Sequence, residues 1–160
     1  MSDDIDVVAT AVSTTPRPHD VRLDVDAYPF RGTATARYGD MDANGHLNNL
    51  ALGAMHDDIR ALVTAEVFTG IHRPTGRSVR VVNSQTVLHF LAEASWPATL
   101  VVGAGIGRIG STSFVLSSAL FVDGGCVSVC DSVMVTVDAA GPTRIENPAR
   151  ERLRLLALTV

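Results

Sequence analysis

Four polar side chains crowd a short span between a strand-like run and the longest helical pattern of the chain. They are Asp40, Asp42, Asn44 and His46. Neighbouring glycines and a helix cap by Asn48 or Asn49 would explain the turns of this span, but not the four side chains together. The first turn of a helix offers free N–H groups and a partial positive charge. A carboxylate there could attack a carbonyl, or deprotonate water beside it, while the N–H groups polarise the carbonyl oxygen.

The span has the pattern Asp-x-Asp-x-Asn-x-His-Leu-Asn-Asn and is followed by a helical pattern. This motif resembles the hotdog-fold thioesterases, and closely the plant acyl-carrier-protein thioesterases and their bacterial single-domain relatives. Weaker similarity extends from about Pro29 to Leu156, so it covers most of the chain. The resemblance implies that Asp42, Asn44 and His46 are catalytic residues.

Thioester hydrolysis suggests a role for each residue of the motif. Asp42 would be the attacking carboxylate or the base for water, and Asn44 would orient Asp42 or the water. His46 would assist proton transfer or only hold the loop. The backbone of Gly45 and Leu47 would polarise the acyl carbonyl. The sequence leaves the choice between nucleophile and base open, and a loop-capping role for Asp42 is the structural alternative.

Several nearby residues have both a structural and a functional interpretation. Asp40 is expected to cap a turn. Asn49 could cap the helix, although relatives use this position near the site. Asp58 falls where relatives often carry a helix glutamate, and a solvated charge is the alternative. His89 falls roughly where the plant enzymes place an additional acid, so the histidine departs from that pattern; Glu93 lies nearby in the sequence.

The substrate is expected to be an acyl group on coenzyme A. One short segment resembles the Gly-x-Ser turn that many relatives place near the pantetheine arm, and a plain hairpin turn is the alternative. It consists of Gly110, Ser111, Thr112 and Ser113. Relatives usually carry aromatic residues on the central helix where this chain has Leu52 and Met55. We therefore expect an aliphatic acyl group first and an aromatic one second.

Hydrophobic periodicity predicts the elements that position these residues. Strands are expected over 28–38, 77–91, 98–108, 111–122 and 126–137, and helices over 47–68 and 147–158. Turns at Gly110 and at 123–125 predict antiparallel hairpins. Gly53 interrupts the long helix, and we expect it to allow close packing on the sheet. The order predicts an α+β domain in which one antiparallel sheet wraps around one long central helix. The resemblance implies the same architecture, a single hotdog fold.

Length and composition set the domain organisation. The 160 residues are enough for one domain with a core. We assign 27–160 to the hotdog thioesterase domain and 1–26 to a flexible or peripheral extension, in which a short strand near 21–25 is an option. Three histidines are expected at the surface. They are His19, His56 and His72.

Charge and cysteine content exclude several classes of function. A net charge of −4 leaves no broad basic surface for nucleic acid. No run of ~18 apolar residues predicts a membrane span, and no basic-then-apolar leader precedes the domain. Cys126 and Cys130 would lie roughly 13 Å apart along a strand, too far for a disulfide. Reduced thiols indicate a cytoplasmic protein, and we expect neither a metal nor a cofactor.

Three functions are weighed against one another. The first is an acyl-CoA thioesterase, the second an acyl-carrier-protein thioesterase, and the third a non-catalytic module that binds acyl-CoA. A hotdog dehydratase is disfavoured because the sequence has no hydratase-type motif. Serine-hydrolase chemistry is disfavoured because it has no Gly-x-Ser-x-Gly elbow. A lone hotdog unit leaves sheet edges uncovered, and relatives join their sheets. We therefore expect a homodimer or a dimer-based tetramer.

Overall fold

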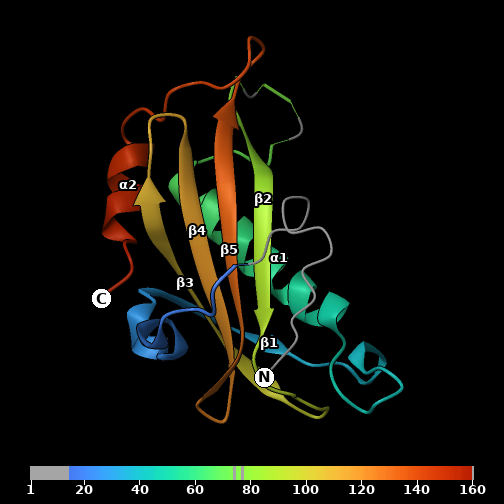
Figure 1. Cartoon of the computed structure of the whole chain (residues 1–160). Coiled ribbons are helices and arrows are strands. Elements are labelled where there is room, and N and C mark those ends of the chain that lie inside the picture. The colour runs from blue at the N-terminus through green and yellow to red at the C-terminus, as the bar shows by residue number, and fades with distance from the viewer. Residues whose placement is uncertain (1–14, 74, 77, 160) are drawn as a thin grey trace, which may run out of the picture.

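The computed structural model describes residues 15–73, 75–76 and 78–159. Five strands form one antiparallel sheet in the order β1-β3-β4-β5-β2 (Figure 1). The strands are β1 Phe30–Thr35, β2 Arg80–Phe90, β3 Thr99–Ile109, β4 Ser113–Val122 and β5 Gly125–Val137. Both predicted hairpins, β3–β4 and β4–β5, are present. β1 and β2 are the free edges of the sheet.

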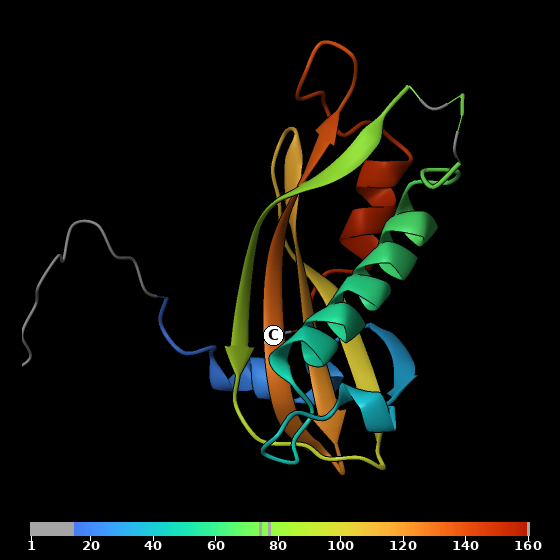
Figure 2. The same cartoon turned by 90° about the vertical axis from the view of Figure 1, so that its right-hand side faces the viewer.

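The long helix α1, Asn49–Val67, lies diagonally across one face of the sheet (Figure 2). This arrangement confirms the predicted α+β architecture of one sheet around one long helix. A Cβ added at Gly53 would meet only Leu88 Cδ1, at 3.8 Å, which is an ordinary contact. The expectation that Gly53 is needed for close helix–sheet packing is therefore wrong for a single chain. Among the described residues, no helix is long and apolar enough to cross a membrane.

The opposite, outer face of the sheet is partly covered by residues 15–29, before β1 (blue in Figure 1). Two short 3-10 helices, Asp20–Leu23 and Val25–Ala27, take the place of the strand considered near 21–25. Arg22 Nη2 donates to Asp131 Oδ1 on β5 at 2.9 Å. Tyr28 is fully buried against β3, where a Cβ at Gly103 would lie 2.7 Å from its Cβ. The boundary between residues 26 and 27 stays a prediction.

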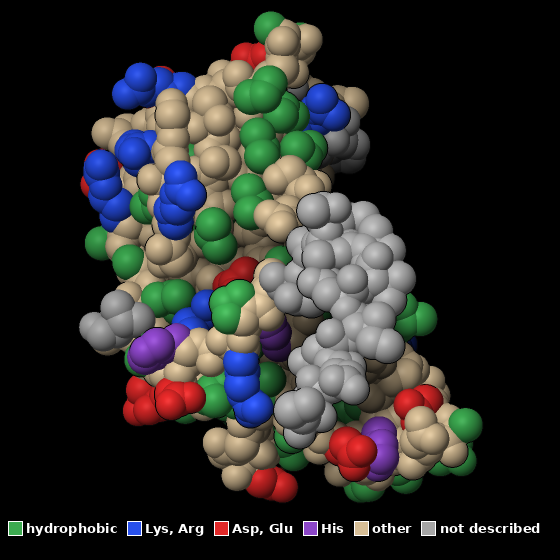
Figure 3. Space-filling view, viewed as in Figure 1, with side chains coloured by type: hydrophobic (Ala, Val, Ile, Leu, Met, Phe, Trp, Pro, Cys, Tyr) green, Lys and Arg blue, Asp and Glu red, His purple; other side chains and the backbone are tan. Residues whose placement is uncertain are grey.

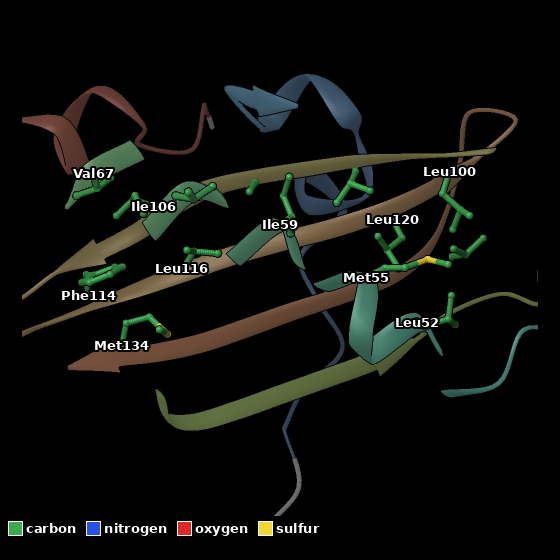
Figure 4. Close-up of a cluster of buried hydrophobic side chains, with 14 of the residues drawn as sticks. Leu52, Met55, Ile59, Val67, Leu100, Ile106, Phe114, Leu116, Leu120 and Met134 are labelled. Carbon is green, nitrogen blue, oxygen red and sulfur yellow. The ribbon is translucent and has the colours of Figure 1, made fainter. Parts of the chain in front are cut away.

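The main core lies between α1 and the inner face of the sheet (Figure 4). Leu52, Met55 and Ile59 from the helix pack against leucines of β3 and β4. At the far end of α1, Phe68 stacks on Phe114 with ring centroids 5.8 Å apart. The apolar stripe read from the sequence therefore faces the sheet, as its spacing of three and four residues requires.

The second helix, α2 Ala149–Leu155, is shorter than the predicted span. Its successor Leu156 leaves the helix, and its carbonyl accepts a hydrogen bond from Ile106 N at 2.7 Å. Leu158 then packs where β3 has no side chain, because a Cβ at Gly105 would lie 2.6 Å from Leu158 Cδ2. The chain thus follows β3 after α2 and does not extend the helix to residue 158.

Candidate functional site

The loop before α1 is anchored by Asp40. This buried carboxylate accepts hydrogen bonds from the backbone N–H of Arg37 at 2.8 Å and from its guanidinium at 2.7 Å. These bonds hold the pKa of Asp40 below its usual value. The Asp40 carbonyl in turn accepts from Asn48 N at 2.8 Å. Asp40 therefore has the structural role predicted for it, tying the strand end to the start of the helix.

Asp42 lies in the exposed part of this loop and is held by one carboxylate oxygen. Its Oδ1 accepts from Asn44 N at 2.8 Å and from His46 N at 3.3 Å. The side chain of Asn44 also hydrogen-bonds to this carboxylate. The Asn44 amide, followed by that of His46, lowers the pKa of Asp42, so the carboxylate is ionised at neutral pH.

Asp42 borders a crevice of about 300 Å³ between the start of α1 and the end of β2. Polar side chains stand on the loop side, and apolar ones form the walls. The lining residues are Asp42, His46, Leu47, Asn49, Leu52, Phe90, Leu91, Ala92 and Glu93. A carboxylate therefore meets an apolar recess at the tip of the helix, as a thioester site needs.

The two amides proposed to polarise the carbonyl are already engaged, one within the loop and one with the segment after β2. Gly45 N donates to Asp42 O at 3.1 Å, and Leu47 N donates to Ala94 O at 2.7 Å. Within the described chain, the helix-tip N–H groups left without a partner are those of Asn49 and Leu50. Of these two residues, Asn49 lines the crevice.

The cap of α1 is Asn48, whose Oδ1 accepts from Ala51 N at 2.7 Å. The capping role that the sequence allowed for either asparagine therefore belongs to Asn48. The side chain of Asn49 stays exposed, and this residue lines the same crevice as Asp42. This separation of roles leaves Asn49 available to a ligand.

Glu93 is brought to the site, whereas His89 is not. His46 Nε2 lies 3.1 Å from Glu93 Oε2, and both residues line the crevice. His89 pairs with Val129 on β5, on the opposite face of β2 from Leu88, which points toward the helix. The nearby acid was visible in the sequence, but its pairing with His46 depends on how the chain turns after β2.

Two other predicted groups lie apart from the crevice within one chain. Asp58 borders a groove on the other side of α1, together with Arg37 and β1. The turn from Gly110 to Ser113 precedes Phe114, which stacks at the C-terminal end of α1. The 19 residues of α1 therefore separate this turn from Asp42 by roughly 28 Å. Figure 1 shows the two regions at opposite ends of the sheet.

Comparison with known proteins decides the family. The family model of the Thioesterase-like superfamily matches residues 36–153 of this chain. The chain belongs to this superfamily. No curated protein matches it. Among solved structures, it is similar to the PA5185 protein of Pseudomonas aeruginosa, at 22% identity and a TM-score of 0.76 over 86% of this chain and 98% of that one.

Two further hotdog structures have thioesterase names. A predicted thioesterase from Bacillus stearothermophilus is 21% identical, with a TM-score of 0.74 over 82% of this chain and 98% of its own. A Thermus thermophilus thioesterase, whose structure holds coenzyme A and Zn, is 19% identical, with a TM-score of 0.71 over 81% and 95%. At these identities the structures establish the hotdog fold of this superfamily member.

The thioesterase-like chain also contains a buried histidine that sequence reasoning placed at the surface. His56 on α1 is 1% exposed. Its Nδ1 lies 2.8 Å from Ser118 Oγ on β4, and its Nε2 lies 3.0 Å from Ser128 Oγ on β5. The signal that could have found it is a pair of serines, Ser118 and Ser128, at inward-facing positions of neighbouring strands.

Cys126 and Cys130 are both free, and burial raises the pKa of each thiol. In the part of the chain that the structure describes, no three His, Cys, Asp or Glu side chains are grouped to hold a metal ion.

Proposed function

We propose that this chain is an acyl-CoA thioesterase, which hydrolyses a thioester to the free acid and the coenzyme A thiol. The observation that carries the proposal is the crevice at the tip of α1. Asp42 lines it with a carboxylate whose backbone hydrogen bonds both go to Oδ1. Asn49, with an unpartnered backbone N–H, lines the same crevice. A carbonyl seated between them would meet an ionised carboxylate and an N–H donor at the positive end of the helix.

Two routes are open to the Asp42 carboxylate. As a nucleophile it would attack the acyl carbon and expel the thiolate, which takes a proton, and water would then hydrolyse the acyl-Asp42 anhydride. As a general base it would take a proton from a water that attacks the same carbon. Asn44 would support either route through the amide that orients Asp42.

His46 would act as the general acid that protonates the leaving thiolate. Glu93 lies beside Nε2 of His46 and would hold the ring at that nitrogen. The other ring nitrogen, Nδ1, has no hydrogen-bond partner among the described residues. With Nε2–H donated to Glu93, a ring that also carries a proton on Nδ1 could pass that proton to the departing thiolate, and the proton released by the attacking water would replace it.

Coenzyme A would bind across two copies of the chain. The turn from Gly110 to Ser113 lies too far from Asp42 in one chain to hold the same substrate at both ends. A two-fold axis beside the free edge strand β2 would reverse the partner end for end and bring its turn toward Asp42. Figure 3 shows basic side chains gathered toward α2, beside this turn, and Arg150 Nη1 donates to Gly110 O at 2.8 Å. Such a surface suits nucleotide phosphates.

The acyl group would occupy the apolar wall of the crevice. Leu52, Phe90 and Leu91 form that wall. Met55, which the sequence also suggested, lies instead beside the groove next to β1. We propose an aliphatic acyl group, and an aromatic one as the second choice. Comparing the turnover of aliphatic and benzoyl thioesters tests this, and a preference for benzoyl would refute it.

Free thiol released from a panel of acyl-CoAs and acyl carrier proteins tests the proposed function. Hydrolysis of the coenzyme A esters supports it. Hydrolysis confined to acyl carrier proteins would favour the carrier-protein enzyme. Tight binding of acyl-CoA without thiol release would show a non-catalytic module and would refute the proposal.

A further inference from the structure

His56 has no part in the chemistry proposed above, yet it lies in the core directly behind the crevice. The residue one turn earlier on the same helix face is Leu52, which lines the crevice. Its partner Ser128 pairs across the sheet with Phe90, which lines the opposite wall. The bond between His56 and Ser128 therefore joins the two walls of the crevice from behind.

Stability alone is a poor explanation for this buried trio. His56 is 1% exposed, Ser118 1% and Ser128 0%. Polar groups removed from water stabilise a protein little even when they are hydrogen-bonded, and apolar side chains of similar shape do as well or better. A fully satisfied buried network instead fixes the relative position of the elements that it joins, because hydrogen bonds require a specific geometry and apolar contacts do not.

Directional contacts between α1 and the sheet are few. Within the described chain, the side-chain hydrogen bonds from α1 to the strands come from His56 and from Arg60, whose Nη1 donates to Ser132 Oγ at 2.8 Å. The remaining packing is apolar and would tolerate a shift of the helix along its axis. His56 stands nearer to the helix tip, so it sets the position of that tip relative to the end of β2.

We propose that His56 is a positioning residue that holds the tip of α1, with Asn49 and Leu52, at the distance from β2 that the thioester needs. The proposal deepens the thioesterase function and rests on it. Neutral His56 fits this role, because burial lowers its pKa to about 4. Arg60 on α1 lowers that pKa further, and Asp131 on β5 opposes the shift. The neighbouring thiol of Cys130 on β5 stays protonated, and β4 presents the hydroxyl of Ser118.

Three variants test this role. The triple variant His56→Leu, Ser118→Ala, Ser128→Ala removes every polar group of the trio and leaves none unsatisfied. His56→Gln keeps a donor and an acceptor in place. Thr64→Val is the matched control, because its buried hydroxyl lies on the same helix but bonds only to Arg60 O, within the helix.

The triple variant should melt near the wild-type temperature but lose about ten- to a hundredfold in kcat, as expected for an ångström-scale displacement. His56→Gln should be less stable than the triple variant and yet more active, and Thr64→Val should keep wild-type kcat. A purely structural role predicts that activity follows stability, so a triple variant with wild-type kcat would overturn the proposal.

Amide hydrogen exchange provides a readout that does not depend on turnover. In the triple variant, the amides of Ala51, Leu52 and Gly53 should exchange faster, while those near Val67 stay unchanged. Unchanged protection at the helix tip would overturn the role of His56. If the wild type releases no thiol from any thioester, the proposed function fails, and hydrogen exchange still decides the positioning role.

Discussion

At Asp42, two backbone amides anchor one carboxylate oxygen, and the proposed mechanism would use this carboxylate as nucleophile or base. Asp42→Asn keeps an oxygen acceptor for the loop and removes the charge. We expect kcat to fall by about 10²–10⁴-fold, the usual contribution of such a group, with the fold intact. Steady-state thiol release measures this.

The matched control for that substitution is Asp58→Asn, which removes an exposed carboxylate on the other side of α1. It should leave kcat unchanged. Because the pKa of Asp42 lies below its usual value, the rate should also not fall through titration of this group as the pH is lowered from 7 to 5. A loss of equal size in both variants would remove Asp42 from the mechanism.

Glu93 is expected to act through His46. The pair is largely exposed, with 75% of the Glu93 side chain accessible, so the free energy at stake is small. Glu93→Gln should lower kcat by about two- to fivefold, as the 0.2–1 kcal/mol of an exposed ion pair allows. Raising the salt concentration should shrink the difference between the two proteins, and a salt-independent difference would argue against an ion pair.

At the residue scale, the sequence predicts most directly the groups that lie close together along the chain, and their catalytic roles stay predictions. Asp42, Asn44 and His46 follow one another, and the loop that joins them closes on itself. The pairing of His46 with Glu93 depends on a contact between distant segments, so no spacing rule could reveal it. Which helix-tip N–H groups remain available to a substrate also depends on the tertiary structure, because Leu47 N donates to Ala94 O of a distant segment.

At the scale of the elements, the seating of α1 on the sheet should depend on pH through His56. Burial depresses its pKa from 6.5 to about 4, so the folded state binds fewer protons than the unfolded state between these values. The contribution of His56 to the free energy of unfolding is therefore fully present above pH 6.5. It should fall by about 3 kcal/mol as the pH drops from 6.5 through 4. Urea unfolding at several pH values measures this.

The triple variant His56→Leu, Ser118→Ala, Ser128→Ala serves as the control for that measurement. Its free energy of unfolding should vary less with pH over the same window, since it no longer buries an ionisable ring. Equal slopes in the two proteins would show that other groups cause the acid sensitivity.

Gly53 offers a second prediction at this scale. A Cβ there meets only an ordinary contact, and glycine lowers helix stability by about 1 kcal/mol relative to alanine. Gly53→Ala should therefore raise the melting temperature by about 2–4 °C in a chain of this size. Calorimetry of a dilute sample measures the effect, and a lower melting temperature would mean that another chain packs against this position.

Elements were predicted by type more reliably than by their ends. The period-two runs and the hairpin turns determine β3, β4 and β5 almost completely. The last helix was predicted too long because Leu156 and Leu158 continue its apolar pattern, while tertiary contacts with β3 take them out of it. His56 was misplaced because a histidine is polar in any pattern, and only the facing serines make its burial tolerable.

For the whole molecule, the proposed two-fold pairing makes each site depend on both copies. Asp42→Asn would disable the catalytic end, and Ser111→Glu would place a negative charge on the exposed turn proposed to lie near the nucleotide. Each homodimer should be nearly inactive. Mixing equal amounts with subunit exchange should restore about a quarter of the wild-type activity, because half of the dimers then carry one intact site.

Two outcomes of that mixing experiment would contradict the shared site. Subunit exchange is first verified by mass. If the mixture is then no more active than its two components, Asp42 and the turn of the same chain serve the same substrate, and the site is not shared. A monomer at micromolar concentration would exclude the pairing itself. Light scattering of the unmodified protein checks the second point.

The glycine positions of β3 have a further consequence for the two ends of the described chain. Tyr28 and Leu158 fill neighbouring side-chain-free notches at Gly103 and Gly105, and Thr159 N donates to Ala27 O at 3.0 Å. Segments that open and close the domain therefore meet on one strand. A circular permutant that joins them by a short linker and begins at the Ala139–Ala140 turn should keep the same core. That turn follows β5 at the end away from Ser128, which pairs with Phe90 of the crevice, so new fusions could be attached far from the crevice.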